Sequence, residues 1–240
     1  MKKTLMTSIA AATLSAGLAA PSMADVSATA GFVTDYVYRG SALGDAGAYF
    51  SVDYEASGFY AGVWAIQDGD ATGNGLEVDY YAGYGQEFDN GLNFSLGYTA
   101  YTYTYASNYL QNFEDEFGGS IGYKGFALSA YYGWDHNFDA DTKTPLETYS
   151  YIYTDLSWSG EVFGAVIGHY ASDLEDSKQN TSYNYAEISA SGEVATLDMT
   201  LTVGKKFGVE QDGKNYVDGE RVTDTGTGYI VLDVSKTFSL

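Results

Sequence analysis

The sequence of 240 residues contains no cysteine, which excludes disulfide bonds, thiolate metal sites and cysteine nucleophiles. Proline occurs only at Pro21 and Pro145, so little interrupts extended, hydrogen-bonded structure. No stretch after residue 24 approaches the roughly 20 apolar residues of a membrane helix, and the mean hydropathy is slightly negative. Basic residues are scarce as well: 11 Lys and Arg stand against 32 Asp and Glu, and a net charge of −21 argues against nucleic acid as a partner.

Aromatic residues, by contrast, are abundant, with 24 Tyr, 12 Phe and 3 Trp. Acidic chains are often disordered, but disordered chains carry few aromatic residues because such residues drive burial. We therefore expect a folded protein. The tyrosine ring is amphipathic, so it suits both a membrane interface and the filling of a polar interior, and we expect tyrosines in both places.

The N-terminal segment has the pattern of a secretory signal peptide. Lys2 and Lys3 precede an apolar run over residues 5–20, and Ser22-Met23-Ala24 supplies small residues at the −3 and −1 positions. We expect residues 1–24 to be cleaved after export through the Sec pathway, leaving residues 25–240 as a single domain with a formal charge of −23. A retained signal anchor is the alternative, but the run is short and rich in Ala and Ser.

Alternation of apolar and polar residues dominates the rest of the chain. In residues 92–99, Leu92, Phe94, Leu96 and Tyr98 alternate with Asn93, Ser95, Gly97 and Thr99. This period of two is typical of a strand with one apolar and one polar face. About twelve segments of about 10–14 residues show the pattern, which predicts an all-β protein.

The connections between these segments alternate between tight and long. Tight ones lie at residues 56–58, 89–91, 124–125, 159–161 and near 192–193, and long polar ones lie between them. Bacterial barrels have short periplasmic turns and longer extracellular loops. We predict a transmembrane antiparallel up-and-down β-barrel of about 12 strands, placed in the outer membrane with both termini in the periplasm. A soluble β-sandwich is the alternative fold, since it also has many alternating strands.

Acidic residues recur on the polar faces, which a barrel would turn toward its lumen. A wall of carboxylates would attract cations and repel anions, although these residues could equally be ordinary solvated positions. Asp35 and Arg39 are expected on the inward face of the first strand, and Arg39 is expected to pair with an acid on a neighbouring strand. The candidate lumen-lining residues are Asp35, Arg39, Asp53, Glu55, Glu77, Asp79, Glu114, Glu116, Glu147, Asp155, Glu187, Asp198 and Asp233.

No catalytic, cofactor or metal site is predicted. The two histidines, His136 and His169, belong to no recognisable Ser, His, Asp arrangement. Residues 68–73 resemble the opening of a calcium loop, but the pattern does not continue as one, and an ordinary acidic loop is the preferred interpretation.

The N-terminal third resembles the TorF-like porins of proteobacteria, a group of exported proteins without an assigned substrate. The resemblance rests on residues 34–40 (TDYVYRG), 52–54 (VDY), 58–65 (GFYAGVWA) and 76–84 (LEVDYYAGY). It implies an outer-membrane barrel with channel activity and offers no catalytic residues to transfer.

The last strand alternates like the others and ends in Phe238-Ser239-Leu240. Outer-membrane barrels commonly end in an aromatic residue that the barrel-assembly machinery reads, and here the aromatic residue stands two places before the end. We expect this strand to contact that machinery and the finished barrel to contact outer-membrane lipid.

Two functions are compatible with these patterns, and neither requires a cofactor or catalysis. The first is a porin-like channel for passive diffusion of small solutes, with a preference for cations. The second is a non-conducting structural or adhesive barrel that acts through its extracellular loops. Inward small residues such as Gly97 and Gly118 favour an open channel, whereas inward tyrosines such as Tyr151 and Tyr153 favour a filled lumen.

Overall fold

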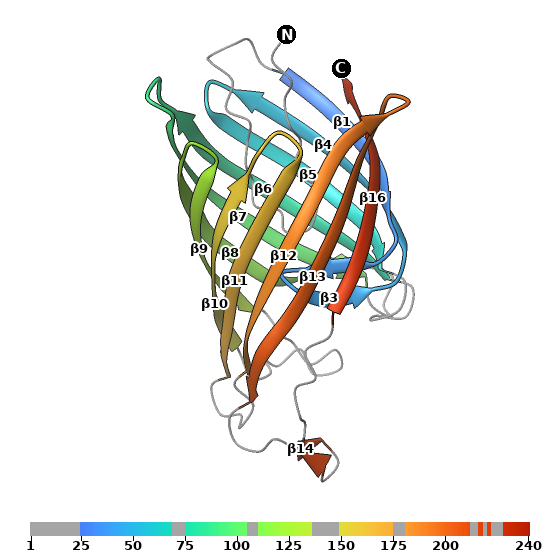
Figure 1. Cartoon of the computed structure of the whole chain (residues 1–240), viewed down its shortest axis with the longest axis vertical. Helices are drawn as coiled ribbons and strands as arrows, with labels where there is room; N and C mark the ends of the chain where they lie inside the picture. Colours follow the sequence, from blue (N-terminus) through green and yellow to red (C-terminus); the bar gives the residue numbers. More distant parts are fainter. Residues whose placement is uncertain are drawn as a thin grey trace.

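The computed structural model describes residues 25–68, 75–104, 110–135, 149–174, 181–211, 216–217, 220–221 and 228–240. Twelve antiparallel strands form a closed barrel, in the order β1-β16-β13-β12-β11-β10-β9-β8-β7-β6-β5-β4 around the wall (Figure 1). The predicted all-β, up-and-down barrel of about 12 strands is therefore confirmed, and the sandwich alternative is wrong. No helix in the described part of the chain is long and apolar enough to cross a membrane. The predicted signal peptide lies outside the described residues.

The wall strands follow one another along the chain, interrupted twice by a short hairpin that stands apart from the wall. The wall consists of β1 (Asp25–Val33), β4 (Gly47–Ala56), β5 (Phe59–Asp68), β6 (Gly75–Glu87), β7 (Leu92–Thr104), β8 (Leu110–Tyr123), β9 (Phe126–Asp135), β10 (Tyr149–Ser159), β11 (Phe163–Leu174), β12 (Thr181–Val194), β13 (Leu197–Gln211) and β16 (Gly228–Ser239). The short strands are β2 (Tyr36–Tyr38) with β3 (Ser41–Gly44), and β14 (Tyr216–Val217) with β15 (Glu220–Arg221).

Tight turns join the strands at one end of the barrel, where both described chain ends also lie (Figure 1). Ser57-Gly58, with φ of 52° and 87°, and Lys124-Gly125, with φ of 49° and 88°, are two-residue turns with both residues at positive φ. Such turns match the right-handed twist of the flanking strands. The turn predicted near residues 192–193 is misplaced: β12 continues to Val194, and Ala195-Thr196 makes the turn.

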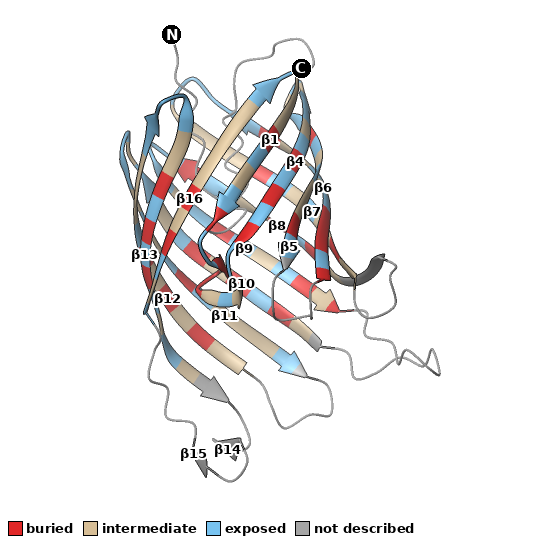
Figure 2. Ribbon diagram, turned by 90° about the vertical axis from the view of Figure 1, so that its right-hand side faces the viewer, coloured by how far each residue is buried: buried red, intermediate tan, exposed pale blue. Residues whose placement is uncertain are grey.

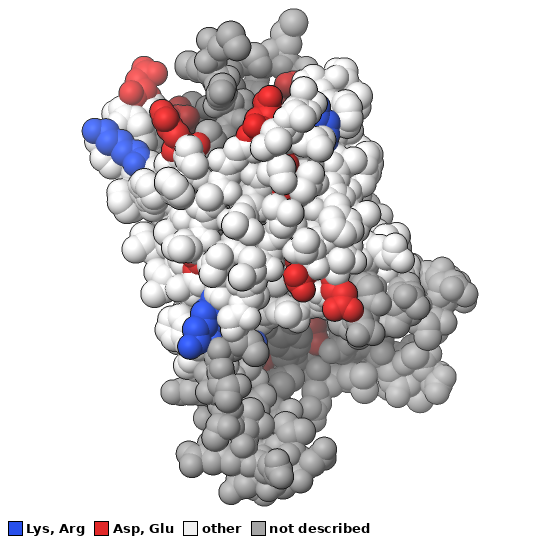
Figure 3. Space-filling view, turned by 45° about the vertical axis from the view of Figure 1, so that its right-hand side comes forward, with Lys and Arg blue, Asp and Glu red and all other residues white. Residues whose placement is uncertain are grey.

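The outer surface of the barrel is apolar around its middle. Large side chains such as Leu128, Ile167 and Leu201 are exposed there. Figure 2 shows exposed and buried residues interspersed along the wall strands. Figure 3 shows a broad uncharged band on this face, with Lys, Arg, Asp and Glu gathered toward the two ends. A soluble protein does not expose a continuous apolar belt of this kind, whereas a barrel surrounded by lipid requires one.

Lys236 lies on the outer face of the last wall strand, in phase with the exposed Ile230 and Phe238. Its Nζ donates a hydrogen bond of 2.5 Å to the backbone carbonyl of Thr196, in the turn between β12 and β13. The aliphatic stem therefore covers the wall while the ammonium group reaches the polar end of the barrel.

Tyrosine rings fill much of the lumen, and seven of them lie over a glycine of the neighbouring strand. A Cβ added to any of these glycines would come within 2.1 to 2.5 Å of the paired tyrosine side chain, so only glycine leaves room for the ring. Each pair is also a register pair of the sheet. The pairs are Gly31 with Tyr49, Gly62 with Tyr81, Gly83 with Tyr60, Gly118 with Tyr131, Gly133 with Tyr151, Gly168 with Tyr185 and Gly204 with Tyr229.

The space that inward glycines were expected to leave open is thus largely occupied. Tyr60 lies beside both Gly83 and Gly97, and Tyr131 lies beside Gly118. Between these side chains lies a small cavity, with room for about one water molecule. The expectation that tyrosines fill the lumen describes this interior better than the expectation of open space.

Candidate functional site

The hairpin of β2 and β3 stands apart from the wall and carries the first candidate site residue. Its strands pair with each other, Val37 with Ala42 and Tyr38 with Ser41. The tip consists of Arg39 and Gly40, with φ of 49° and 77°, so it is again a two-residue turn with both residues at positive φ. Arginine is unusual at such a position because its Cβ is strained there.

The placement of Asp35 and Arg39 on the first strand is therefore wrong. The first strand, β1, ends at Val33, Asp35 is exposed in the bend that follows, and Arg39 is buried at the hairpin tip. The physical reason is that the hairpin residues continue the alternation of the strand before them. Periodicity alone could not show that the chain leaves the wall after residue 33.

The hairpin crosses the lumen to the opposite wall. It emerges between β1 and β4, and the strand order places β9 and β10 on the far side of the barrel. The guanidinium carbon of Arg39 lies over the rings of Tyr131 on β9 and Tyr153 on β10. Gly40 packs so closely on Tyr185 of β12 that a Cβ there would lie 2.4 Å from the tyrosine Cβ. Near its origin the hairpin packs through Tyr36 and Val37 in an apolar cluster of the wall.

Arg39 is held by one carboxylate and by aromatic rings. Its two terminal nitrogens donate hydrogen bonds of 2.5 and 2.8 Å to the two oxygens of Glu116, and each side chain is only 4% exposed. The guanidinium carbon lies 3.9 Å from the ring centre of Tyr153, 4.7 Å from that of Tyr38 and 5.1 Å from that of Tyr131. A two-pronged ion pair flanked by rings is a strong arrangement for a guanidinium group. Arg39 therefore pairs across the lumen with β8, and the expected pairing with a neighbouring strand is wrong.

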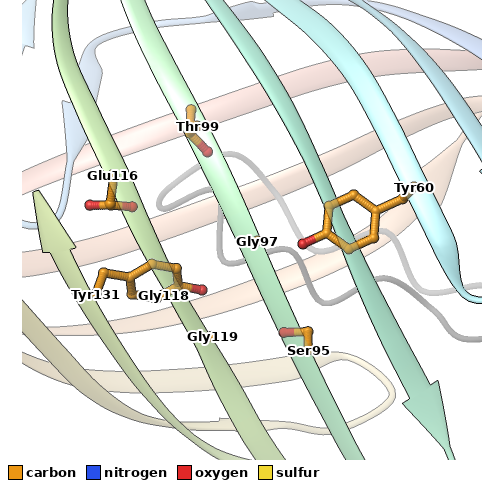
Figure 4. Close-up of a pocket in the computed structure, with 8 residues that line it drawn as sticks. All are labelled: Tyr60, Ser95, Gly97, Thr99, Glu116, Gly118, Gly119 and Tyr131. Atoms are coloured by element: carbon orange, nitrogen blue, oxygen red, sulfur yellow. The ribbon is translucent and has the colours of Figure 1, made fainter.

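Glu116 is oriented by further tyrosines. The hydroxyl of Tyr151 donates to Glu116 Oε2 at 2.6 Å, and that of Tyr101 donates to Oε1 at 3.4 Å. We name the wall residues around the guanidinium, Glu116, Tyr131, Tyr151 and Tyr153, the guanidinium box. The small cavity of the lumen lies beside this box: Glu116 and Tyr131 line it together with Tyr60, whose ring extends from β5 toward Gly97 (Figure 4).

Most of the other predicted inward acids accept a hydrogen bond from an inward hydroxyl. They do not form a ring of carboxylates facing open water, as a wide channel would require. Asp233 accepts from Tyr49 at 2.9 Å, Glu187 from Tyr229 at 2.6 Å, Glu77 from Tyr103 at 3.0 Å, Asp155 from Ser129 at 3.3 Å, and Asp53 from Ser51 at 2.8 Å and from Tyr81. Glu55 and Asp198 share the inward face nearer the tight turns, and Glu147 lies outside the described residues.

A second group of acids lies between the box and the long connections. In register, Asp79 of β6 and Glu114 of β8 both flank Tyr101, and Asp135 of β9 lies opposite Glu114. Asp79 is 9% exposed, and its Oδ1 has no hydrogen-bond partner. We name Glu77, Asp79, Glu114 and Asp135 the acidic cluster. In the described part of the chain, no group of three or more Asp, Glu or His residues is arranged to hold a metal ion.

The hairpin tyrosines remain neutral next to these acids. Burial raises the pKa of the Tyr36 phenol, and the nearby carboxylates Glu77 and Asp79 raise it further. Tyr36 therefore stays a neutral hydroxyl on the side of the lumen where the acidic cluster lies.

Sequence reasoning missed part of this arrangement. Asp135 is buried on the inward face of β9, and its phase with Ser129 and Gly133 could have identified it. The tyrosines of the box carry no comparable signal, because their role depends on which strand lies opposite. His169, considered for catalysis, lies exposed on the outer face, with its Nδ1 3.0 Å from Asn184 Oδ1. His136 lies outside the described residues, as do residues 69–74 of the possible calcium loop.

A closed barrel with an apolar belt and a polar interior defines the class: this is a transmembrane β-barrel. Residues 17–238 match a family described as "Bacterial protein of unknown function (Gcw_chp)", and the chain belongs to that family. No curated protein matches it in sequence. The resemblance to TorF-like porins has no counterpart in this description and stays a prediction.

Solved structures resemble the chain in fold. A structure from a study of in-meso crystallization of membrane proteins has a TM-score of 0.50 at 9% identity, with 90% of this chain and 84% of the other covered. The COG4313 outer membrane channel from Pseudomonas putida F1 has a TM-score of 0.49 at 10% identity, covering 92% and 97%. The CymD monoaromatic hydrocarbon channel has a TM-score of 0.45 at 10% identity, covering 92% and 89%. Identities this low concern the fold alone.

Proposed function

We propose that the protein is a narrow porin-like channel of the bacterial outer membrane, for passive diffusion of small solutes with a preference for cations. The observation that carries the proposal is the charge of the lumen. Acids from β4, β6, β8, β9, β10, β12, β13 and β16 face inward, whereas the described inward basic side chains are Arg39 and Lys206. Such a wall produces a negative potential that favours cations.

The orientation and route of export belong to the same proposal. The protein would be exported through the Sec pathway, lose residues 1–24, and insert with its tight turns and both termini in the periplasm. The strand that closes the barrel, β16, would be read by the assembly machinery. Its end is well placed for closure, since Phe238 pairs with Ala28 of β1 and the Leu240 amide donates to the Val26 carbonyl at 2.8 Å.

The hairpin tip is the constriction of this channel. It spans the lumen from the seam between β1 and β4 to β8 and β10, so a solute has to pass beside it or displace it. Arg39 also places a positive charge in this constriction, buried against Glu116. Its removal should therefore raise the conductance and strengthen the preference for cations.

Purified protein in planar lipid bilayers tests the proposal. Arg39→Gly retains the turn because glycine accepts positive φ, and we expect it to conduct more than the wild type, with a reversal potential in a KCl gradient that shows cation preference. The matched control is Lys124→Gly, the same kind of change at the same φ of 49° in a turn at the far end of the barrel, which should conduct like the wild type. Anion preference would overturn the cation proposal.

A second function is favoured by a different observation. Tyr153 and Tyr185 are fully buried in the lumen, and their hydroxyls hydrogen-bond to each other, so this side of the interior is packed like a core. A barrel filled in this way could serve as a non-conducting structural or adhesive protein. If neither the wild type nor Arg39→Gly conducts in preparations shown to be folded, the channel proposal is wrong and this second function remains.

A further inference from the structure

The guanidinium box has the features of a ligand-binding site, and the protein's own Arg39 occupies it. We propose that the box binds the guanidinium group of a solute when the hairpin moves away, and that Arg39 is an internal competitor for that solute. The inference deepens the proposed channel function, since it rests on solute entry into the lumen and names guanidinium compounds as the class admitted.

The wall side of the box is complete without the hairpin. Glu116 presents both oxygens to one planar group, and the Tyr151 hydroxyl donates to its Oε2 at 2.6 Å. Tyr153 and Tyr131 supply ring faces from the two adjacent strands. All of these residues belong to the rigid wall, so the site persists when the occupant leaves.

The occupant, by contrast, is attached by a strained and incompletely paired connection. Arg39 has a positive φ that its side chain disfavours, and its buried Nε has no hydrogen-bond partner. A free guanidinium compound carries neither restriction, because it is not tied to a turn and can orient all of its N–H groups. Competition between the two is therefore possible without any change in the wall.

The acidic cluster provides an independent reason to expect a cationic ligand. It lies next to the box on the side of the long connections, and the buried Asp79 Oδ1 faces this group of acids without a partner. A cation that enters from that side would pass these carboxylates before it reaches Glu116. Their negative charge would raise its local concentration near the box.

The shape of the box favours a planar organic cation. Stacking on ring faces and pairing with both carboxylate oxygens at once require a flat, forked group, whereas an ammonium ion makes point contacts. Roughly tenfold weaker binding of ethylammonium than of ethylguanidinium is therefore expected, the ratio that one lost charge-assisted hydrogen bond produces.

Ethylguanidinium, which reproduces the end of an arginine side chain, tests the inference by chemical rescue. In Arg39→Gly the box is vacant, and ethylguanidinium should reduce the raised current toward the wild-type value, with ethylammonium effective only at about tenfold higher concentration. The double variant Arg39→Gly with Glu116→Gln should lose this block. Wild type and Lys124→Gly should respond weakly, because Arg39 occupies their box.

A binding measurement separates the two proposals. Thermal unfolding in detergent should show that ethylguanidinium raises the Tm of Arg39→Gly but not that of the double variant. Arg39→Asn replaces Arg39→Gly if the latter does not fold, since asparagine also accepts positive φ. Conduction by Arg39→Gly with equal block of all variants would overturn the binding site and leave the channel intact. If ethylguanidinium raises the Tm of Arg39→Gly but no variant conducts, the channel proposal is wrong and the binding site remains.

Discussion

Replacing Gly133 by alanine should destabilise the barrel far more than the size of a methyl group suggests. A Cβ at this position would lie 2.1 Å from Cε1 and Cζ of Tyr151 and 2.4 Å from its hydroxyl oxygen. Non-bonded carbons prefer about 3.5–4.0 Å, so the ring has to shift by about 1.5 Å. That shift would break the 2.6 Å hydrogen bond from Tyr151 to Glu116.

The magnitude follows from these two effects. Overpacking in a well-packed interior costs about 1–3 kcal/mol, and loss of a hydrogen bond to a charged acceptor costs about 1.5–3 kcal/mol. Replacement of glycine within a strand recovers about 0.5–1 kcal/mol of conformational entropy. The free energy of unfolding should therefore fall by about 2–5 kcal/mol.

Urea unfolding in lipid vesicles, followed by tryptophan fluorescence, measures this change. The matched control is Gly192→Ala, because no atom lies within 4 Å of a Cβ at Gly192, and it should leave the stability unchanged or slightly raised. In the background of Tyr151→Ala, Gly133→Ala should become nearly neutral, which gives a coupling energy of at least about 2 kcal/mol. Additive effects, or equal behaviour of Gly133→Ala and Gly192→Ala, would refute the reasoning.

Two further predictions concern the outer surface and the closing strand. Ile167→Arg places a charge in the apolar belt and should lower the free energy of unfolding in vesicles by about 2–4 kcal/mol. The control Val162→Arg, in the turn before β11, should lower it by less than about 1 kcal/mol. Equal effects of the two variants would contradict the position of the belt. Deletion of residues 238–240 removes the pairing of Phe238 with Ala28 and the final hydrogen bond to Val26, so the fraction of heat-modifiable, folded protein in the outer membrane should fall. An unchanged fraction would show that these residues are dispensable for assembly.

The barrel was predictable because strand alternation is a local property. The pattern of residues 92–99 recurs as the outward and inward faces of β7, and the turns at 57–58 and 124–125 carry glycine where positive φ is required. The inward orientation of acids such as Glu116 and Asp233 follows from the same alternation of apolar and polar residues. Local pattern was sufficient for these features since each depends on residues close in sequence.

The site depends on partners far apart in sequence, which local pattern does not encode. Arg39 and Glu116, which form a hydrogen bond, are 77 residues apart in the sequence, and Tyr151 is 35 residues from the same carboxylate. Only the closed ring of strands places β8 and β10 opposite the hairpin. Alternation also continued through Tyr36 and Tyr38, so the point where the chain enters the lumen had no signature in the residues themselves.

The pairing of inward tyrosines with glycines has a consequence for how related sequences can vary. At Gly168 and Tyr185, or at Gly204 and Tyr229, a larger residue on one strand is compatible with the wall only if the ring on the other is lost. The two positions of a pair should therefore change together during evolution, while lipid-facing positions such as Ile188 can exchange freely among apolar residues. Joint substitution at such pairs would trace the strand register in an alignment of relatives, without any structure.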